Sequence, residues 1–151
     1  FLAIGSGGLL AQLVLIGPLV ARFGEARVIV IGLALLACSM LLQPVIRLPV
    51  SGVLLMGVLM TGHSLAFPSA GALLSRNTPG ERQGSIMGLM MASNAAGRII
   101  VPPLFGLIYG RVHADAPWYV GAAMIALVVL VALQAVRLLD AQKAAERAAA
   151  G

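Results

Sequence analysis

Residues 78–110 read T-P-G-E-R-Q-G-S-I-M-G-L-M-M-A-S-N-A-A-G-R-I-I-V-P-P-L-F-G-L-I-Y-G. A short charged turn leads into a long run of mostly apolar residues. Such a run is long enough to cross the hydrocarbon core of a bilayer as a helix. The run contains one charged residue, Arg98. A charge at membrane depth costs free energy, so it marks a candidate functional residue. This stretch therefore predicts a membrane helix that contains a candidate functional residue, Arg98.

The composition points to the same class of protein. The chain has 151 residues, of which 60% are hydrophobic and only 10% charged, with a mean hydropathy of +1.02. Soluble domains carry about 25% charged residues, so a soluble fold is excluded. The ten basic residues are scattered between apolar runs, which does not predict a nucleic-acid surface. No cysteine or histidine pair has metal-ligand spacing, and no cofactor is expected. The single Cys38 is interpreted as a small buried hydrophobe.

Five apolar runs are each close to the length of a membrane span. They cover residues 1–20, 28–46, 50–74, 84–109 and 118–138. Because lipid offers no hydrogen-bond partner to the backbone, each run must be a helix. The predicted fold is an all-α integral membrane protein with five transmembrane helices. Residues 1–138 form the bundle, and residues 139–151 form a polar tail.

The distribution of basic residues predicts the orientation. Alternate connectors and the tail hold seven of the ten, namely Arg22, Arg27, Arg76, Arg82, Arg137, Lys143 and Arg147. Loops rich in Lys and Arg lie on the cytoplasmic side, so the C-terminus is expected in the cytoplasm. The arginine-, alanine- and glycine-rich composition favours a bacterial source, and hence the bacterial inner membrane. Because Phe1 is not an initiator methionine, we expect a C-terminal fragment of a longer multi-pass protein.

The third and fourth spans are more polar than the others. The second and fifth are almost purely aliphatic, which suits lipid-facing positions. Polar groups within the membrane face a bundle interior or a cavity, so the third and fourth spans are expected to line a pathway. Their candidates for contact with substrate or coupling ion are Arg98, Asn94, His63 and Phe67.

Two of these candidates have alternative interpretations. Arg98 can act on the substrate or the coupling ion, or it can pair with an acid elsewhere or extend to the interface. His63 can carry a proton, because an unperturbed imidazole titrates near neutral pH. Alternatively, it is a neutral imidazole hydrogen-bonded inside the bundle.

The start and the packing face of the fourth span also have recognisable patterns. Residues 78–81 have the form of a capping box, with Thr78 as N-cap. Small residues then recur every fourth position, which suits close helix packing in lipid, whether sliding or static. Expected packing and kink positions are Gly84, Gly88, Gly97, Pro102 and Gly106.

Three motifs resemble the major facilitator superfamily. Residues 17–27, G-P-L-V-A-R-F-G-E-A-R, resemble its loop motif G-x-x-x-D-R-x-G-x-[RK]-[RK], although alanine replaces the acid and one basic residue. Residues 67–84 are similar to the end of helix ten and its following loop in drug–proton antiporters. Residues 97–106 resemble the helix-eleven motif G-x-x-x-G-P-x-x-G-G, with Gly97, Pro102 and Gly106 matching.

The resemblance implies helices eight to twelve of a twelve-helix transporter that works by alternating access. It implies a conformational-latch loop on the cytoplasmic side. The residues expected in that latch are Gly17, Arg22, Gly24, Arg27 and Glu81, with Arg22 and Glu81 as a candidate pair.

The expected activity is proton-coupled export of small drug-like molecules. The expected partners are the lipid bilayer, the missing N-terminal portion of the same transporter, a small-molecule substrate and protons. The alternative is a uniporter or symporter for sugars or other small metabolites. A non-transporting assembly protein is a further alternative. An enzyme is not expected, because no cluster of reactive side chains is visible.

Overall fold

The computed structural model describes residues 14–46 and 49–149, and every regular element in them is helical. The helices are α2 (Ile16–Phe23), α3 (Glu25–Leu42), α4 (Pro49–Arg76), α5 (Gly80–Arg111) and α6 (Ala116–Ala149). Four of them, α3 to α6, are long and apolar enough to cross a membrane. The predicted all-α membrane fold is confirmed. The first expected span lies mostly outside the described residues, and α2 contains only its end.

The break between α2 and α3 depends on one glycine. Gly24 has φ +80° and ψ 158°, and it is the one residue of the described chain with a positive φ. Side chains with a Cβ rarely adopt that conformation, whereas glycine does so at little cost. The chain can therefore end α2 and begin α3 within a single residue.

Helices α3 and α4 pack through a pair of glycines. A Cβ placed on Gly32 would lie 2.6 Å from the carbonyl oxygen of Gly62, and a Cβ on Gly62 would lie 2.6 Å from that of Gly32. The two backbones thus touch, as small residues allow in membrane helices. Farther along the same interface, the Ser39 hydroxyl donates a 2.6 Å hydrogen bond to the carbonyl oxygen of Leu55.

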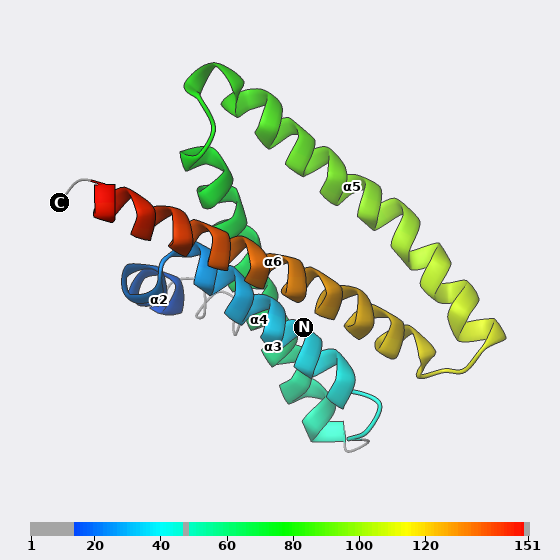
Figure 1. Ribbon diagram of the computed structural model, residues 1–151. Helices are drawn as coiled ribbons and strands as arrows, with labels where there is room; N and C mark the ends of the chain where they lie inside the picture. Colours follow the sequence, from blue (N-terminus) through cyan, green and yellow to red (C-terminus); the bar gives the residue numbers. More distant parts are fainter. Residues whose placement is uncertain (1–13, 47–48, 150–151) are drawn as a thin grey trace.

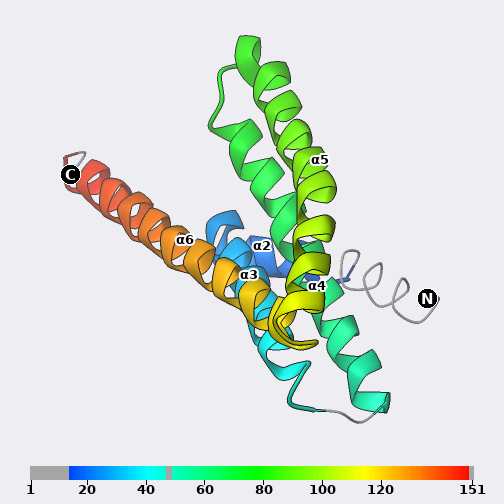
Figure 2. The same cartoon turned by 90° about the vertical axis from the view of Figure 1, so that its right-hand side faces the viewer.

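Helix α6 packs on another face of α3. Gly121 lies against Met40, whose Cε would be 2.6 Å from a Cβ at position 121, and Ala122 is buried. Helix α3 therefore lies between α4 and α6 (Figures 1 and 2). The lipid-facing position expected for this span stays a prediction, and in the described chain its small residues admit two helical neighbours. Cys38, expected to be buried, is exposed.

Helix α5 lies apart from the others over most of its length. Figure 1 shows it joined to α4 by one turn and to α6 by another, with open space between. None of its residues is buried, whereas α3 buries five. In the described chain, α5 is thus a long apolar helix without a close neighbour along most of its surface.

The start of α5 differs from the predicted capping box. The helix begins at Gly80, its N-cap is Pro79, and no side chain caps it. The Thr78 hydroxyl instead donates a 2.7 Å hydrogen bond to the carbonyl oxygen of Leu74, in the last turn of α4. The capping box was wrong because the hydroxyl satisfies a carbonyl of the preceding helix, which a short connector brings within reach.

Candidate functional site

One side of α4 carries two of the predicted substrate or coupling residues. His63, Phe67, Ala70, Leu74 and Asn77 follow each other at spacings of four and three residues. Such spacing places side chains on one side of a helix. We call these five residues the α4 stripe. The residues of α4 that are buried, such as Gly62 and Leu65, occupy a different side. The stripe is therefore one of the sides of α4 that the described packing leaves at least partly accessible.

The first two residues of the α4 stripe, His63 and Phe67, form an aromatic pair. The rings of His63 and Phe67 are stacked, with centroids 5.7 Å apart and planes 7° from parallel. The distance lies within the range at which aromatic rings attract one another. His63 is exposed and Phe67 is half-buried. The pair presents an aromatic surface and the imidazole nitrogens at the middle of a membrane-spanning helix.

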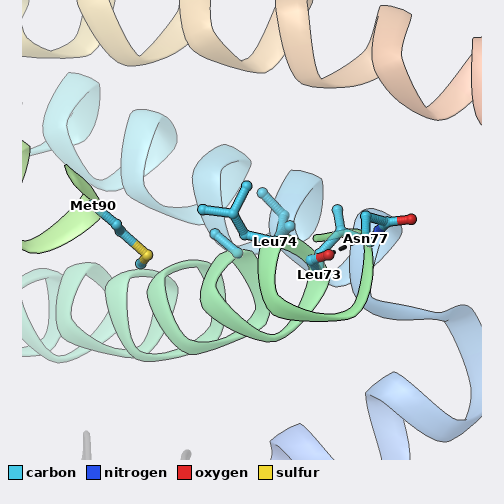
Figure 3. A pocket seen from close by; sticks show the side chains of 6 residues that line it. Leu73, Leu74, Asn77 and Met90 are labelled. Atoms are coloured by element: carbon cyan, nitrogen blue, oxygen red, sulfur yellow. Dashed lines mark hydrogen bonds between the residues drawn. The ribbon is translucent and has the colours of Figure 1, made fainter. Parts of the chain in front are cut away.

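The last three residues of the α4 stripe, Ala70, Leu74 and Asn77, line a pocket of about 450 Å³. Its lining residues are Ile29, Ala70, Leu73, Leu74, Asn77 and Met90. Figure 3 shows Met90 on one side of the pocket and Leu73, Leu74 and Asn77 on the other. Pockets for small molecules measure about 300–1,000 Å³, so this one has room for a drug-sized group. Three helices, α3, α4 and α5, contribute to it.

The pocket is almost wholly apolar. Asn77 is the one polar residue in its lining, and its Nδ2 donates a 2.8 Å hydrogen bond to the carbonyl oxygen of Leu73. Met90 supplies a thioether, a polarisable group that adapts to ligands of varied shape. The chemistry of this lining suits an apolar ligand and offers few groups to a sugar.

Arg98 and Asn94 lie on α5, away from the pocket. They are four residues apart and so share one side of that helix, with Arg98 exposed and Asn94 half-buried. Arg98 is about 12 Å along α5 from Met90 at 1.5 Å per residue. Within the described residues, Arg98 forms no ion pair. The structure therefore brings His63 and Phe67 together but does not bring Arg98 and Asn94 to them.

Two ion pairs join three helices at one end of the molecule. Arg76 Nη1 at the end of α4 lies 3.1 Å from Glu25 Oε1 at the start of α3. Arg27 Nη2 lies 2.9 Å from Asp140 Oδ2 on α6. The Glu25 side chain is only 8% exposed, whereas Arg27 and Asp140 are both about half exposed. We call these four residues the end clamp.

The end clamp involves other residues than the Arg22–Glu81 pair suggested for the latch loop, and that pair stays a prediction. Arg22 lies over the ring of Phe23, with its guanidinium carbon 5.6 Å from the centroid. Glu81 is exposed, and the described residues contain no ion pair between it and Arg22. The short connector places Glu25 and Arg27, rather than Arg22, within reach of α4 and α6. Sequence reasoning missed Glu25, Arg76 and Asp140, although Glu25 and Arg76 are charges at helix ends on the side richest in basic residues and Asp140 lies in the later part of α6.

The predicted packing positions of α5 have no neighbour in the described chain. A Cβ at Gly84, Gly88, Gly97 or Gly106 would meet nothing within 4 Å. Pro102 lies inside α5, which continues as one helix past it. The close glycine contacts occur instead at positions 32, 62 and 121. The role of the α5 glycines stays a prediction.

Comparison with known proteins gives a match over the whole chain. The family model of the Major Facilitator Superfamily matches residues 1–151. No solved structure matches the chain.

Within residues 14–46 and 49–149, no group of three His, Cys, Asp or Glu side chains could hold a metal ion.

Proposed function

Because the chain belongs to the major facilitator superfamily, a family of secondary transporters, we propose that it exports small drug-like molecules in exchange for protons. Transporters of this class alternate between inward- and outward-open states around a site near the bilayer midplane. The chain contributes membrane-spanning helices and acts on a small-molecule substrate across a lipid bilayer. The export direction and the proton coupling are parts of the proposal.

The observation that carries the proposal is the α4 stripe. Its apolar pocket of about 450 Å³ begins at Ala70, three residues after Phe67 of the His63–Phe67 pair. A site for sugars would need several hydrogen-bonding side chains, because unpaired hydroxyl groups are costly to bury. The pocket offers only the Asn77 amide. Its lining therefore supports drug-like export over the alternative of a sugar transporter.

We propose His63 as the proton-carrying group, and Arg98 as a contributor to coupling. His63 supports this role by its exposed position in the middle of α4. Arg98 supports it because no described acid neutralises its charge. A charge kept within a membrane helix is costly and so is retained where it has a task.

We also propose a location and an arrangement. The protein lies in a bacterial inner membrane with its C-terminus in the cytoplasm, as the distribution of basic residues supports. A further portion of the same transporter supplies the other bundle. The twelve-helix arrangement implied by the motif order supports this part of the proposal.

The test is efflux of a fluorescent apolar dye by cells that express the complete transporter. We expect efflux that stops when an ionophore removes the proton gradient. His63→Gln should abolish gradient-driven efflux, and Arg98→Ala and Arg98→Lys should both reduce it. A His63→Gln protein with full proton-driven efflux would remove His63 as the carrier. If both Arg98 variants kept full activity, its coupling role would be wrong.

A further inference from the structure

The proposed export function leaves open which molecules are recognised, and the α4 stripe bears on that question. We infer that the stripe binds a planar aromatic part of the transported molecule, with the ring system against His63 and Phe67 and an apolar substituent in the adjoining pocket. This inference rests on the proposed function, since it names the substrate class of the same site.

The first observation is the geometry of the ring pair. Planes only 7° from parallel give His63 and Phe67 a common orientation, so a third flat ring can align with both. The exposure of His63 leaves its ring accessible in the described chain. Aromatic rings gain about 0.5–1.5 kcal/mol from such contacts beyond the area they bury. A flat aromatic ligand therefore gains stacking free energy at this site that a ligand without a flat ring system does not gain.

The second observation is the distance between the ring pair and the pocket. Phe67 and the pocket residue Ala70 are three residues apart, about 4.5 Å along the helix axis. His63 and Leu74 are separated by about 16 Å along the same axis. One molecule of two or three fused rings with a short side chain can span both parts of the α4 stripe.

The third observation is the charge of the site. Neither the α4 stripe nor the pocket lining contains a carboxylate or a basic side chain other than the imidazole of His63. A ligand cannot be held there by a buried ion pair. Recognition must come from aromatic surface, apolar area and at most a few hydrogen bonds. These properties favour a neutral planar molecule or a cation whose charge is spread over its rings.

Two organic cations of equal charge and different shape test this inference. Proflavine is a flat three-ring cation, and tetraphenylphosphonium is a cation without a flat fused-ring system. Binding of each is titrated to the complete transporter purified in detergent. We expect Phe67→Leu to weaken proflavine binding about 5- to 10-fold, while tetraphenylphosphonium binding changes by less than about 2-fold. His63→Gln should weaken proflavine binding in the same selective way.

Two control variants separate ring contact from damage to the fold. Phe67→Trp keeps an aromatic surface at position 67 and should keep proflavine affinity. Tyr109→Leu removes an exposed aromatic ring from α5, away from the stripe, and should leave the binding of both cations unchanged. The melting temperature of every variant is measured in the same detergent, and a variant is compared only if it melts as the wild type does.

Three results would overturn the inference: no binding of proflavine to the wild type, equal weakening of the binding of both cations by Phe67→Leu, or no weakening of either. Efflux is measured separately. If the wild type exports neither cation, the proposed export function fails, whereas the binding titrations decide the inference by themselves.

Discussion

At the scale of single residues, the contact between Gly32 and Gly62 is the closest approach of α3 and α4 that the glycines of the described chain show. A methyl group at position 32 would lie 2.6 Å from a backbone oxygen and 2.8 Å from a backbone nitrogen of α4. Backbone cannot move aside as a flexible side chain can. Even alanine, the smallest replacement, must therefore push α3 and α4 apart.

We predict that Gly32→Ala lowers the free energy of unfolding by about 1–3 kcal/mol, the usual cost of overpacking. Gly57→Ala on α4 is the matched control, because a Cβ there meets nothing within 4 Å. The control should change stability by less than about 0.5 kcal/mol. Denaturant titration in one detergent measures both. Equal effects of the two substitutions would show that the close approach does not occur.

The two arms of the end clamp differ in burial, and this predicts unequal consequences. Arg76→Ala leaves the Glu25 carboxylate unpaired with its side chain only 8% exposed. Such a loss costs about 1–3 kcal/mol. Arg27→Ala breaks a pair whose members are both about half exposed, and exposed pairs contribute about 0–1 kcal/mol. We expect Arg76→Ala to lower the melting temperature clearly more than Arg27→Ala does.

A second substitution checks the reason for that difference. Adding Glu25→Gln to Arg76→Ala removes the unpaired charge and should recover part of the lost stability. If the double variant were no more stable than Arg76→Ala, the cost would not come from the buried carboxylate.

At the scale of elements, the sequence predicted the spans well and their ends less well. The expected spans 50–74, 84–109 and 118–138 lie within α4, α5 and α6. Apolar length decides whether a segment is a membrane helix, and length is a local property. The helix start at Thr78 was wrong because its hydroxyl has two possible partners. Only the path of the chain decides that it bonds Leu74 at the end of α4.

The packing partners of each helix were not predictable in the same way. Lipid tails are as apolar as leucine, so hydrophobicity does not distinguish a helix surrounded by lipid from one surrounded by helices. This is why α3 was expected at the periphery, although it lies between α4 and α6. The glycine at position 32 indicates that another helix can approach α3 closely. The sequence alone does not identify Gly62 as the residue that it meets.

The functional role of the candidate site residues stays a prediction. His63 and Phe67 were named from their residue types and from the motif around them, and the structure stacks their rings. The pocket and the end clamp were not foreseen. Both depend on residues far apart in the chain, such as Ile29 and Ala70, which line one pocket, and Arg27 and Asp140, which form an ion pair. Local patterns contain no information on those distances.

At the scale of the whole molecule, the end clamp bears on how the chain is oriented across the membrane. Its ion pairs bring together the start of α3, the end of α4 and the later part of α6. These segments belong to the three regions richest in basic residues. Their common location agrees with a chain that crosses the membrane alternately, with these regions on one side.

Labelling of single cysteines tests which side that is. In a Cys38→Ser background, we predict that a membrane-impermeant maleimide labels a His113→Cys protein in intact cells. The same reagent should label an Arg82→Cys protein only after the cells are permeabilised. Both positions are exposed connectors or helix ends, so the comparison is matched. The reverse pattern would place the C-terminus outside the cell.

The most direct test of proton-coupled export is the movement of protons caused by the substrate itself. The complete transporter is placed in liposomes with a trapped pH dye, and tetraphenylphosphonium is added outside without a proton gradient. This cation binds no proton, so any pH change comes from transport, and protein-free liposomes provide the background. Antiport predicts that the interior becomes alkaline as the cation enters. An interior that becomes acidic, or that stays unchanged while the cation enters through the protein, would contradict proton-coupled export.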